Sequence, residues 1–469
     1  MKDDRRQRWV LGLTSVASMM VALDALVVAT ALTTIRTDLG ASVEALEWTV
    51  NAYSLCFAVL LMTAAALGDR LGRRRMFTTG LVVFAVASAA CALAPGIGWL
   101  ITARAVQGTG AAMVMPQAMA LLTAAFPPQQ RGRALGLFSG VTGLAVAGGP
   151  LVGGAITEGL DWRWVFWLNL PLALVVVPLA VRRIEESRGP AQPLDTGGLL
   201  LVSAASFGLA WGLVRGNVAG WASAEVVVAL AAGAVLVPVF AVWESRRAQP
   251  MLPMRFFRNR AFSAGSGAGF FLFGGLYGAV FLMAQFMQAV LGYGPLGAGL
   301  RVFPWTATLM IVGPIAGARV DRFGARRLAV AGLALQAAGL AWIGLIASPG
   351  MAYGALVAPL VVAGCGVSMA MPAAQVAVVN AVAREELGKA SGAFNMLRQL
   401  GGVFGVAILA AVFAGAGGFG SAQTFSDGFV PAIVVAAVLS AAGALAAWAV
   451  PAHRTAAEVE VSMRERSAV

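Results

Sequence analysis

The sequence predicts an all-α membrane protein, a bundle of helices long enough to cross a lipid bilayer. Of its 469 residues, 59% are hydrophobic and only 12% are charged, whereas about a quarter of a typical soluble domain is charged. The mean hydropathy is +0.82. Apolar runs of about 18 residues or more, which can cross a hydrocarbon core of roughly 30 Å, recur along the whole chain. These observations exclude an ordinary soluble domain.

Fourteen apolar runs qualify as membrane-spanning helices. In chain order they lie at 10–32, 48–67, 77–95, 99–126, 134–157, 164–181, 196–214, 224–243, 261–291, 296–316, 328–347, 352–380, 390–415 and 428–450.

Basic residues predict how these helices are oriented. If the amino terminus is cytoplasmic, most of the 33 Lys and Arg residues fall in cytoplasmic segments, and only Arg36, Arg163 and Arg215 fall in loops on the other side. Positively charged cytoplasmic loops are the rule in membrane proteins. We therefore expect fourteen spans with both termini in the cytoplasm. Because the arginines are dispersed over short loops, the net charge of +12 does not predict nucleic-acid binding.

The chain contains a two-fold repeat. Ala66–Arg75 returns in altered form at Ala318–Arg327, and Gly108–Pro116 matches Gly364–Pro372. Repeated helix bundles around a central site are characteristic of secondary transporters. The spacer between the two copies has no counterpart elsewhere. We predict a six-helix bundle at 1–190, two inserted linker helices at 191–250, a second six-helix bundle at 251–455 and a cytoplasmic tail at 456–469.

Several kinds of site are missing from the sequence. The only histidine, His453, follows the last predicted span, so no histidine-based metal or haem site is expected within the bundle. The nearest match to a nucleotide-binding P-loop, Gly388-Lys389-Ala390, lacks the hydroxyl that would hold Mg²⁺. The three cysteines are scattered and suggest packing. We expect no metal, no cofactor and no enzymatic activity.

Asp24 is the only acidic residue that the sequence places well inside a span. At 1.5 Å per residue it lies roughly 21 Å from the inner boundary, and Arg104 lies roughly 8 Å from the outer boundary. A charge within the membrane is costly and is functional by default, with a nearby partner. We predict that Asp24 exchanges a proton in competition with substrate and that Arg104 tunes its protonation. The alternative is a fixed structural ion pair.

The motifs of this chain, taken together, resemble the major facilitator superfamily, in its fourteen-span drug:proton antiporter branch. They are Asp24 in ALDALVVATAL, the loop Gly68–Arg74, the segment Arg104–Gly110, the Gly149–Gly154 element and the stretch Trp162–Pro171. The likeness covers nearly the whole chain. It implies the major facilitator fold and a proton gradient as the driving force.

The resemblance also implies roles for the loop and for the Gly-Pro element. Asp69, Arg70, Gly72, Arg73 and Arg74 would form a gating loop, with Asp321 and Arg322 as a degenerate second copy. A basic loop that merely fixes topology would explain the arginines but not Asp69. Gly149, Pro150, Gly153 and Gly154 would bend the fifth span during antiport, although close helix packing is the alternative.

Aromatic and amide side chains suggest a loose pocket for amphiphilic organic molecules. On the ninth span they recur at helical spacing, and on the thirteenth span they surround an arginine near the midplane. The candidates are Tyr277, Phe281, Gln285, Gln288, Asn395, Arg398 and Gln399. Contacts between helices would explain the amides equally well, and bonds to backbone carbonyls would explain Arg398.

The expected function is therefore proton-coupled export of an organic drug or antibiotic across the inner (cytoplasmic) membrane. The expected partners are a small organic substrate, protons and the lipid bilayer, and we expect a monomer. Uptake or exchange of a small metabolite on the same fold is the alternative, which the Gly-Pro element disfavours. A membrane enzyme or a channel is disfavoured because the sequence has no nucleophile cluster and has an asymmetric repeat with gating loops.

Overall fold

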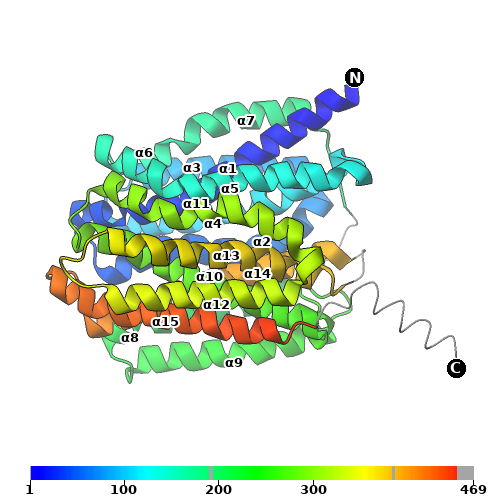
Figure 1. The fold of residues 1–469 in the computed structure, drawn as a ribbon. Helices are drawn as coiled ribbons and strands as arrows, with labels where there is room; N and C mark the ends of the chain where they lie inside the picture. The colour runs from blue at the N-terminus through cyan, green and yellow to red at the C-terminus, as the bar shows by residue number, and fades with distance from the viewer. Residues whose placement is uncertain (1, 190–193, 383–385, 452–469) are drawn as a thin grey trace, which may run out of the picture.

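The structure, a computed structural model, describes residues 2–189, 194–382 and 386–451, except for some side chains in the first, fifth and eleventh helices. Helices joined by loops make up this part of the chain, which contains no strand (Figure 1).

The first group of helices is α1 (Lys2–Leu39), α2 (Val43–Leu71), α3 (Arg73–Ala92), α4 (Ile97–Ala125), α5 (Pro128–Gly159), α6 (Trp164–Trp167) and α7 (Asn169–Arg183). The inserted pair is α8 (Thr196–Ala219) and α9 (Ala224–Arg246). The second group is the short 3₁₀ helix η1 (Met254–Arg258) followed by α10 (Arg260–Ala289), α11 (Pro295–Phe323), α12 (Ala325–Ile346), α13 (Gly354–Val379), α14 (Leu387–Ala416) and α15 (Ala422–Trp448).

The long helices lie side by side and alternate in direction (Figure 1). The first residues of α1 and the last residues of α15 therefore lie at the same end of the bundle, on the right in Figure 1, which we call the terminal end. The other end, where α1 ends and α2 begins, we call the opposite end. An even number of passes between the two ends follows from this arrangement.

Within the described residues, twelve helices are long and apolar enough to cross a membrane, with α6 and α7 counted together as Trp164–Arg183. Helices α4 and α5 are not among the twelve. In α4, Gln107, Gln117 and Pro116 interrupt a glycine-rich sequence and lower its hydropathy. All fourteen predicted ranges overlap these helices, but the number of membrane crossings and the orientation stay predictions. The domain boundary near residue 190 and the tail at 456–469 fall outside the described residues.

The two groups of helices pack in the same pairs. In the first group α1 packs against α5, α2 and α3 pack against α4, and α3 packs against α7. In the second group α10 packs against α14, α11 and α12 pack against α13, and α12 packs against α15. Two reciprocal contacts, α5 with α11 and α2 with α14, join the groups. This pairing is what a repeat of one six-helix unit produces.

The two groups also meet through polar and ring contacts at the opposite end. Gln288 Nε2 donates to the carbonyl of Thr30 at 3.1 Å, and the Leu296 N–H donates to Glu158 Oε2 at 2.9 Å. The guanidinium of Arg36 lies 4.0 Å from the ring centroid of Phe419. The opposite end is therefore closed in this structure.

Helix α8 lies beside both groups. It packs mainly against α9, and also against α2 and α14. At the opposite end Arg215 of α8 pairs with Glu44 of α2 at 3.3 Å and with Glu225 of α9 at 2.9 Å. Asn217 of α8 donates to the carbonyl of Ala411 in α14. The inserted pair is thus bonded to both groups.

At the terminal end, helix α1 contacts the end of α7 and the segment that follows it. Arg6 pairs with Glu185, just after α7, at 2.7 Å. The guanidinium of Arg183, the last residue of α7, lies 5.3 Å from the ring centroid of Trp9. These contacts tie the start of α1 to the end of α7.

Gly108 sets the distance between α2 and α4, which generates the first prediction. A methyl group on Gly108 would lie 2.9 Å from the carbonyl carbon of Tyr53 and 3.0 Å from its Cα, closer than real contacts allow. We expect Gly108→Ala to lower stability by about 1–3 kcal/mol, as overpacking typically does, measured by thermal unfolding in detergent. Gly98→Ala on the same helix, with nothing within 4 Å of the new methyl group, is the matched control. Equal melting temperatures for the two variants would contradict this account.

Candidate functional site

Asp24 and Arg104 form a buried ion pair. Arg104 Nη1 donates to Asp24 Oδ2 at 2.5 Å. The pair lies inside the first group of helices, and Asp24 is 2% exposed and Arg104 is 1% exposed. The sequence placed both residues at similar depth, and the structure brings them into direct contact.

Two amides complete the surroundings of Asp24. Gln107 Nε2, one turn after Arg104 on α4, donates to Asp24 Oδ1 at 2.8 Å. Asn169 Nδ2 donates to the same oxygen at 3.1 Å. Both amides also donate to Ser88 Oγ on α3, at 2.8 Å from Gln107 and 3.2 Å from Asn169. Asp24 of α1 therefore accepts hydrogen bonds from α4 and α7, and each of its two carboxylate oxygens has at least one donor.

Arg104 is held on its other sides by α2 and α4. Its Nε donates to the carbonyl of Thr49 at 3.2 Å, and its Nη1 donates to Gln107 Oε1 at 2.6 Å. The guanidinium lies 4.2 Å from the ring centroid of Tyr53, a distance at which a cation is attracted to the face of an aromatic ring. The charge of Arg104 is thus balanced by Asp24, its Nε and Nη1 donate to oxygen acceptors, and its guanidinium lies over an aromatic ring.

Sequence reasoning missed Asn169 and Ser88. The predicted sixth span was continuous, but the structure divides it at Leu168 into α6 and α7. Asn169 is the first residue of α7, and its side chain points to Asp24. An amide in an otherwise apolar span was the available signal for Asn169. Ser88 gave no signal, because serine in a helix commonly bonds to its own backbone.

Two further acids are buried, Glu47 and Glu244, and both lie within five residues of a helix end. Helix α2 begins at Val43, five residues before the predicted span. Glu47 therefore lies in its second turn and is 3% exposed. Glu244, near the end of α9, is also buried, and its Oε2 accepts from the Leu252 N–H at 2.9 Å.

The predicted pocket residues divide into two groups. Arg398 of α14 lies 4.7 Å from the ring centroid of Phe273, and Tyr277 packs edge-on against the same ring at 5.4 Å. Arg398 Nε is buried without a hydrogen-bond partner among the described residues, so the predicted alternative of bonds to backbone carbonyls is not observed. Asn395, on the same helix, donates to its own backbone at Ser391. Arg398 and Tyr277 therefore form one aromatic and cationic cluster.

The remaining candidates are packed between helices. Gln285 Nε2 folds back onto the carbonyl of Phe281 at 2.8 Å, and both residues are buried. Gln288 bonds across to α1, as described above, and Gln399 is buried. These positions fit the alternative of contacts between helices.

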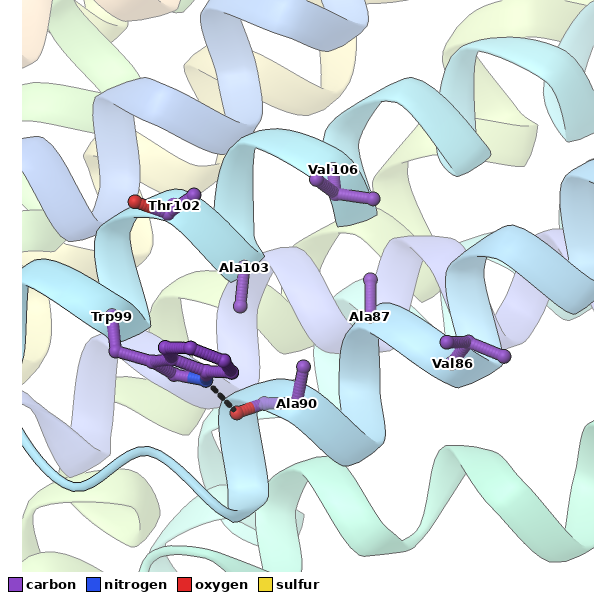
Figure 2. A pocket seen from close by; sticks show the side chains of 7 residues that line it. All are labelled: Val86, Ala87, Ala90, Trp99, Thr102, Ala103 and Val106. Atoms are coloured by element: carbon purple, nitrogen blue, oxygen red, sulfur yellow. Dashed lines mark hydrogen bonds between the residues drawn. The ribbon is translucent and has the colours of Figure 1, made fainter.

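A hollow on the surface of the bundle lies away from these candidates. Figure 2 shows it between α3 and α4, where the Trp99 indole lies beside Ala90 and donates to its carbonyl at 2.9 Å. Its volume is about 200 Å³, and its other lining residues are Val86, Ala87, Thr102, Ala103 and Val106. None of these residues was predicted to contact substrate. The hollow faces outward, since Val86 and Trp99 are both exposed.

The predicted gating loop is bonded to the segment that follows α7. Asp69 Oδ1 accepts from Arg73 Nε and Nη2, both at 2.7 Å, and the Asp69 carbonyl accepts from the Gly189 N–H at 3.1 Å. The Arg73 N–H donates to the carbonyl of Ser187 at 2.9 Å. Gly72 joins α2 to α3 with a φ of +120°, a value that favours glycine. Arg70 is exposed.

Glu186 and Arg74 complete this contact. Glu186 accepts from the N–H groups of Arg74 and Arg75, at 2.9 and 3.2 Å, at the amino terminus of α3, where a negative charge is stabilising. Arg74 Nη1 donates to the carbonyls of Val181 and Ile184 at the end of α7. The loop thus bonds within the first group of helices.

The second copy of the loop is simpler. Gly324 has a φ of +83° between α11 and α12, matching Gly72. Arg322 is exposed, and Arg326 lies 4.9 Å from the ring centroid of Trp448. The side chain of Asp321 lies outside the described residues.

The Gly-Pro element of α5 connects the two groups of helices. A methyl group on Gly149 would lie 2.8 Å from Leu26 Cβ, and one on Gly153 would lie 2.6 Å from the carbonyl oxygen of Val27, so both glycines face α1. Gly154 faces α11, where a methyl group would lie 2.7 Å from Leu296 Cα. Pro150 also faces α11, at Gly299. These residues permit close packing of α5 next to the turn of α1 that follows Asp24.

The profile of the family described as Major Facilitator Superfamily matches residues 14–406 and 265–468. The chain belongs to this superfamily.

Curated relatives of this superfamily member share about a third of its residues. The "Multidrug resistance protein Stp" of Mycobacterium tuberculosis (strain CDC 1551 / Oshkosh) is 35% identical over 413 residues, covering 88% of this chain and 76% of the relative. The "Tetracenomycin C resistance and export protein" of Streptomyces glaucescens is 34% identical over 403 residues, covering 85% and 74%. The "Probable actinorhodin transporter" of Streptomyces coelicolor is 34% identical over 472 residues, covering 98% and 80%.

Solved structures share the fold at low identity. A POT family transporter in complex with a thioalcohol conjugated peptide superposes with a TM-score of 0.71 at 14% identity, covering 92% of this chain and 94% of that one. A bacterial homologue of the human lysosomal transporter Spinster, in an inward-facing and unoccupied conformation, gives 0.67 at 17% identity, covering 95% and 98%. This member of the superfamily is a multi-pass protein of the inner (cytoplasmic) membrane.

The amide of Asn169 generates the second prediction. Asn169→Leu keeps the approximate size of the side chain but removes a donor from Asp24 Oδ1 and from Ser88 Oγ. We expect a loss of about 1–3 kcal/mol in the free energy of unfolding, because buried acceptors lose a partner. Thermal unfolding in detergent measures it. Asn380→Leu is the control, because Asn380 is exposed at the end of α13. An unchanged melting temperature for Asn169→Leu would exclude Asn169 from the network.

Proposed function

We propose that this chain is a proton-coupled antiporter that exports amphiphilic organic compounds, such as drugs or antibiotics, by alternating access. The observation that carries the proposal is the ion pair between Asp24 and Arg104, enclosed within the amino-terminal bundle of a major facilitator protein. The names of the relatives support export, since they denote multidrug resistance, tetracenomycin C export and actinorhodin transport.

The proposed mechanism begins with a proton on Asp24. A protonated Asp24 no longer balances the charge of Arg104, and breaking a buried pair in this way costs about 3–5 kcal/mol. Arg104 can then turn further toward Gln107 Oε1 and the Thr49 carbonyl, its other acceptors. Because Asp24 bonds to α4 and α7 as well, this change alters contacts among several helices at once. Proton binding thereby favours one conformation of the bundle over the other.

The arginine of α14 supplies the proposed substrate contact. Arg398 has no carboxylate partner among the described residues and lies over Phe273 beside Tyr277. A cation and aromatic faces suit molecules that combine fused rings with oxygen acceptors. We place the substrate between this cluster and the face of α1 that carries Asp24, so that binding and protonation influence each other through the same helices.

We further propose fourteen spans with the terminal end in the cytoplasm. The alternation of the helices and the position of both described chain ends support this arrangement (Figure 1). The gating-loop residues then lie in the cytoplasm, where Asp69 would bias the conformational equilibrium without contacting substrate. The closed opposite end faces outward, so the structure corresponds to a stage in which the site is shut off from the outside.

The topology generates the third prediction. Fusion of a periplasmic reporter enzyme after Pro451 should give no activity, because the terminal end is cytoplasmic. The same reporter inserted near Trp221, between α8 and α9, should be active. Alkaline phosphatase activity in whole cells measures both fusions, with immunoblots as the control for expression. A strongly active carboxy-terminal fusion would mean that the number of spans is odd or the orientation inverted.

Transport in everted membrane vesicles generates the fourth prediction and tests the proposed function. We expect the wild-type protein to accumulate ethidium or tetracenomycin C when respiration acidifies the vesicle interior, and a protonophore to abolish this accumulation. Asp24→Asn keeps the shape of the side chain but cannot bind a proton near neutral pH. It should therefore lose at least about nine-tenths of proton-driven uptake, a tenfold effect that corresponds to roughly 1.4 kcal/mol, while counterflow of labelled substrate persists.

Two results would contradict these expectations. Robust proton-driven uptake by Asp24→Asn would remove Asp24 from the coupling mechanism. Accumulation in right-side-out rather than everted vesicles would favour the alternative, proton-coupled uptake of a small metabolite. Glu225→Gln, whose side chain pairs with Arg215 between the two inserted helices, is the control for changes of charge in general.

A further inference from the structure

Glu47 is a buried carboxyl group that the proposed mechanism does not use. It is 3% exposed, and its Oε2 has no partner. Neither oxygen forms a hydrogen bond or ion pair with a residue that the structure describes. Asp24 and Glu244 differ in this respect, since both accept at least one hydrogen bond. Glu47 therefore carries an uncompensated carboxyl group in the closed structure.

Helix α2 packs against α14, and Glu47 lies on roughly the same side of α2 as Met62, which contacts α14. Asn51 lies one turn further on the same face and is fully buried, and neither atom of its amide has a partner. Met62, three turns after Asn51, packs against α14, where its Cγ lies 3.7 Å from the position of a Cβ on Gly392. Thr49 and Tyr53, which contact Arg104, lie on the other side of α2. Glu47 thus belongs to the contact between the two groups of helices.

Two arginines on helices next to α2 are paired with other acids. On α8, Arg215 is shared between Glu44 and Glu225. On α4, Arg104 is held by Asp24 on the far side of α2. The segment Leu400–Ala416 of α14 and the segment Met76–Ala92 of α3 contain no charged residue.

The charged side chains of α1 at the opposite end contact residues other than Glu47. Its Arg36 lies over the ring of Phe419, and its Asp38 pairs with Arg163 at 3.0 Å. Arg36 of α1 and Arg398 of α14, which have no carboxylate partner among the described residues, lie over aromatic rings, and neither forms an ion pair with Glu47.

A carboxylate that lacks a cation or hydrogen-bond donor is strongly disfavoured in a buried site, whereas the neutral acid is tolerated. The contact between α2 and α14 can therefore close only when Glu47 carries a proton. When this contact opens, water reaches the carboxyl group and the ionised form becomes favourable.

We propose that Glu47 is a second proton-binding site, which takes up one proton when the opposite end closes and releases it when that end opens. A hydronium ion in the water at that end transfers its proton to the Glu47 carboxylate, which leaves a water molecule and a neutral acid. Opening reverses the transfer. The proposal rests on the alternating access of the proposed function, but it does not require Asp24 to be the coupling group.

A distance measurement in lipid nanodiscs tests this proposal. The full-length protein would carry Asp24→Asn, so that Asp24 cannot contribute, with its three cysteines replaced. Spin labels would be attached at Thr37 and Gln423, both exposed at the opposite end. Double electron–electron resonance then measures the closed and open populations over about four pH units around neutrality. We expect the ratio of closed to open protein to fall by up to about tenfold per pH unit, the limit for one linked proton.

Variants of Glu47 give the decisive comparison. Glu47→Gln, a permanent mimic of the neutral acid, should stay closed at every pH. Glu47→Asp, which can still ionise, should keep the pH dependence and covers the case in which Glu47→Gln does not fold. Glu44→Gln is the matched control, because it removes an acid three residues away that is paired with Arg215, and it should keep the slope.

Two outcomes would overturn the proposal. One is a closed population that does not depend on pH in the Asp24→Asn background. The other is the same pH dependence in Glu47→Gln as in its parent. Failure of the proposed function has a separate signature, since it would appear as the absence of proton-driven transport of ethidium or tetracenomycin C by the wild-type protein.

Discussion

The rest of the amino-terminal bundle depends on one constraint, the need to balance the charge of Asp24, which is 2% exposed. A buried ion whose partner is removed costs about 3–5 kcal/mol, so α1 and α4 must keep Asp24 and Arg104 in register. The amides of Gln107 and Asn169 extend this requirement to α3 and α7 through Ser88. The Thr49 carbonyl adds α2. A change in the protonation of this single carboxylate therefore alters contacts that involve five helices.

The two-fold repeat explains how the helices pair. The residues that differ between the two copies show where the candidate functional site lies. Both groups of helices pack in the same pairs, so the pairing alone assigns no chemistry to either group. At the positions that match Arg104 and Gln107, the second group has Leu360 and Ala363, both fully buried and apolar. The second group instead carries Arg398 beside two aromatic rings. One bundle thus holds a balanced charge and the other an unbalanced one.

Much of the fold could be read from the sequence because hydropathy acts over whole helices. The predicted spans overlap the observed helices, and the estimated depths of Asp24 and Arg104 anticipated a neighbourhood that the structure shows as a direct contact. The features of the site that the sequence did not predict depend on single turns of a helix. The break at Leu168 turns Asn169 toward Asp24, and an early start of α2 buries Glu47. Gln285 bonds to its own helix. A hydropathy average over eighteen residues does not predict at which residue a helix starts or breaks, or which partner a side chain bonds to.

The length of α1 has a mechanical consequence. It is one uninterrupted helix of 38 residues without an internal proline, about 57 Å long at 1.5 Å per residue. A rod of this kind transmits rotation about its axis with little loss. Asp24 lies fifteen residues from Trp9, roughly four turns, and Trp9 touches the guanidinium of Arg183. A rotation of α1 that begins at Asp24 would change the surroundings of the Trp9 indole. The fluorescence of Trp9 would therefore report on changes at Asp24.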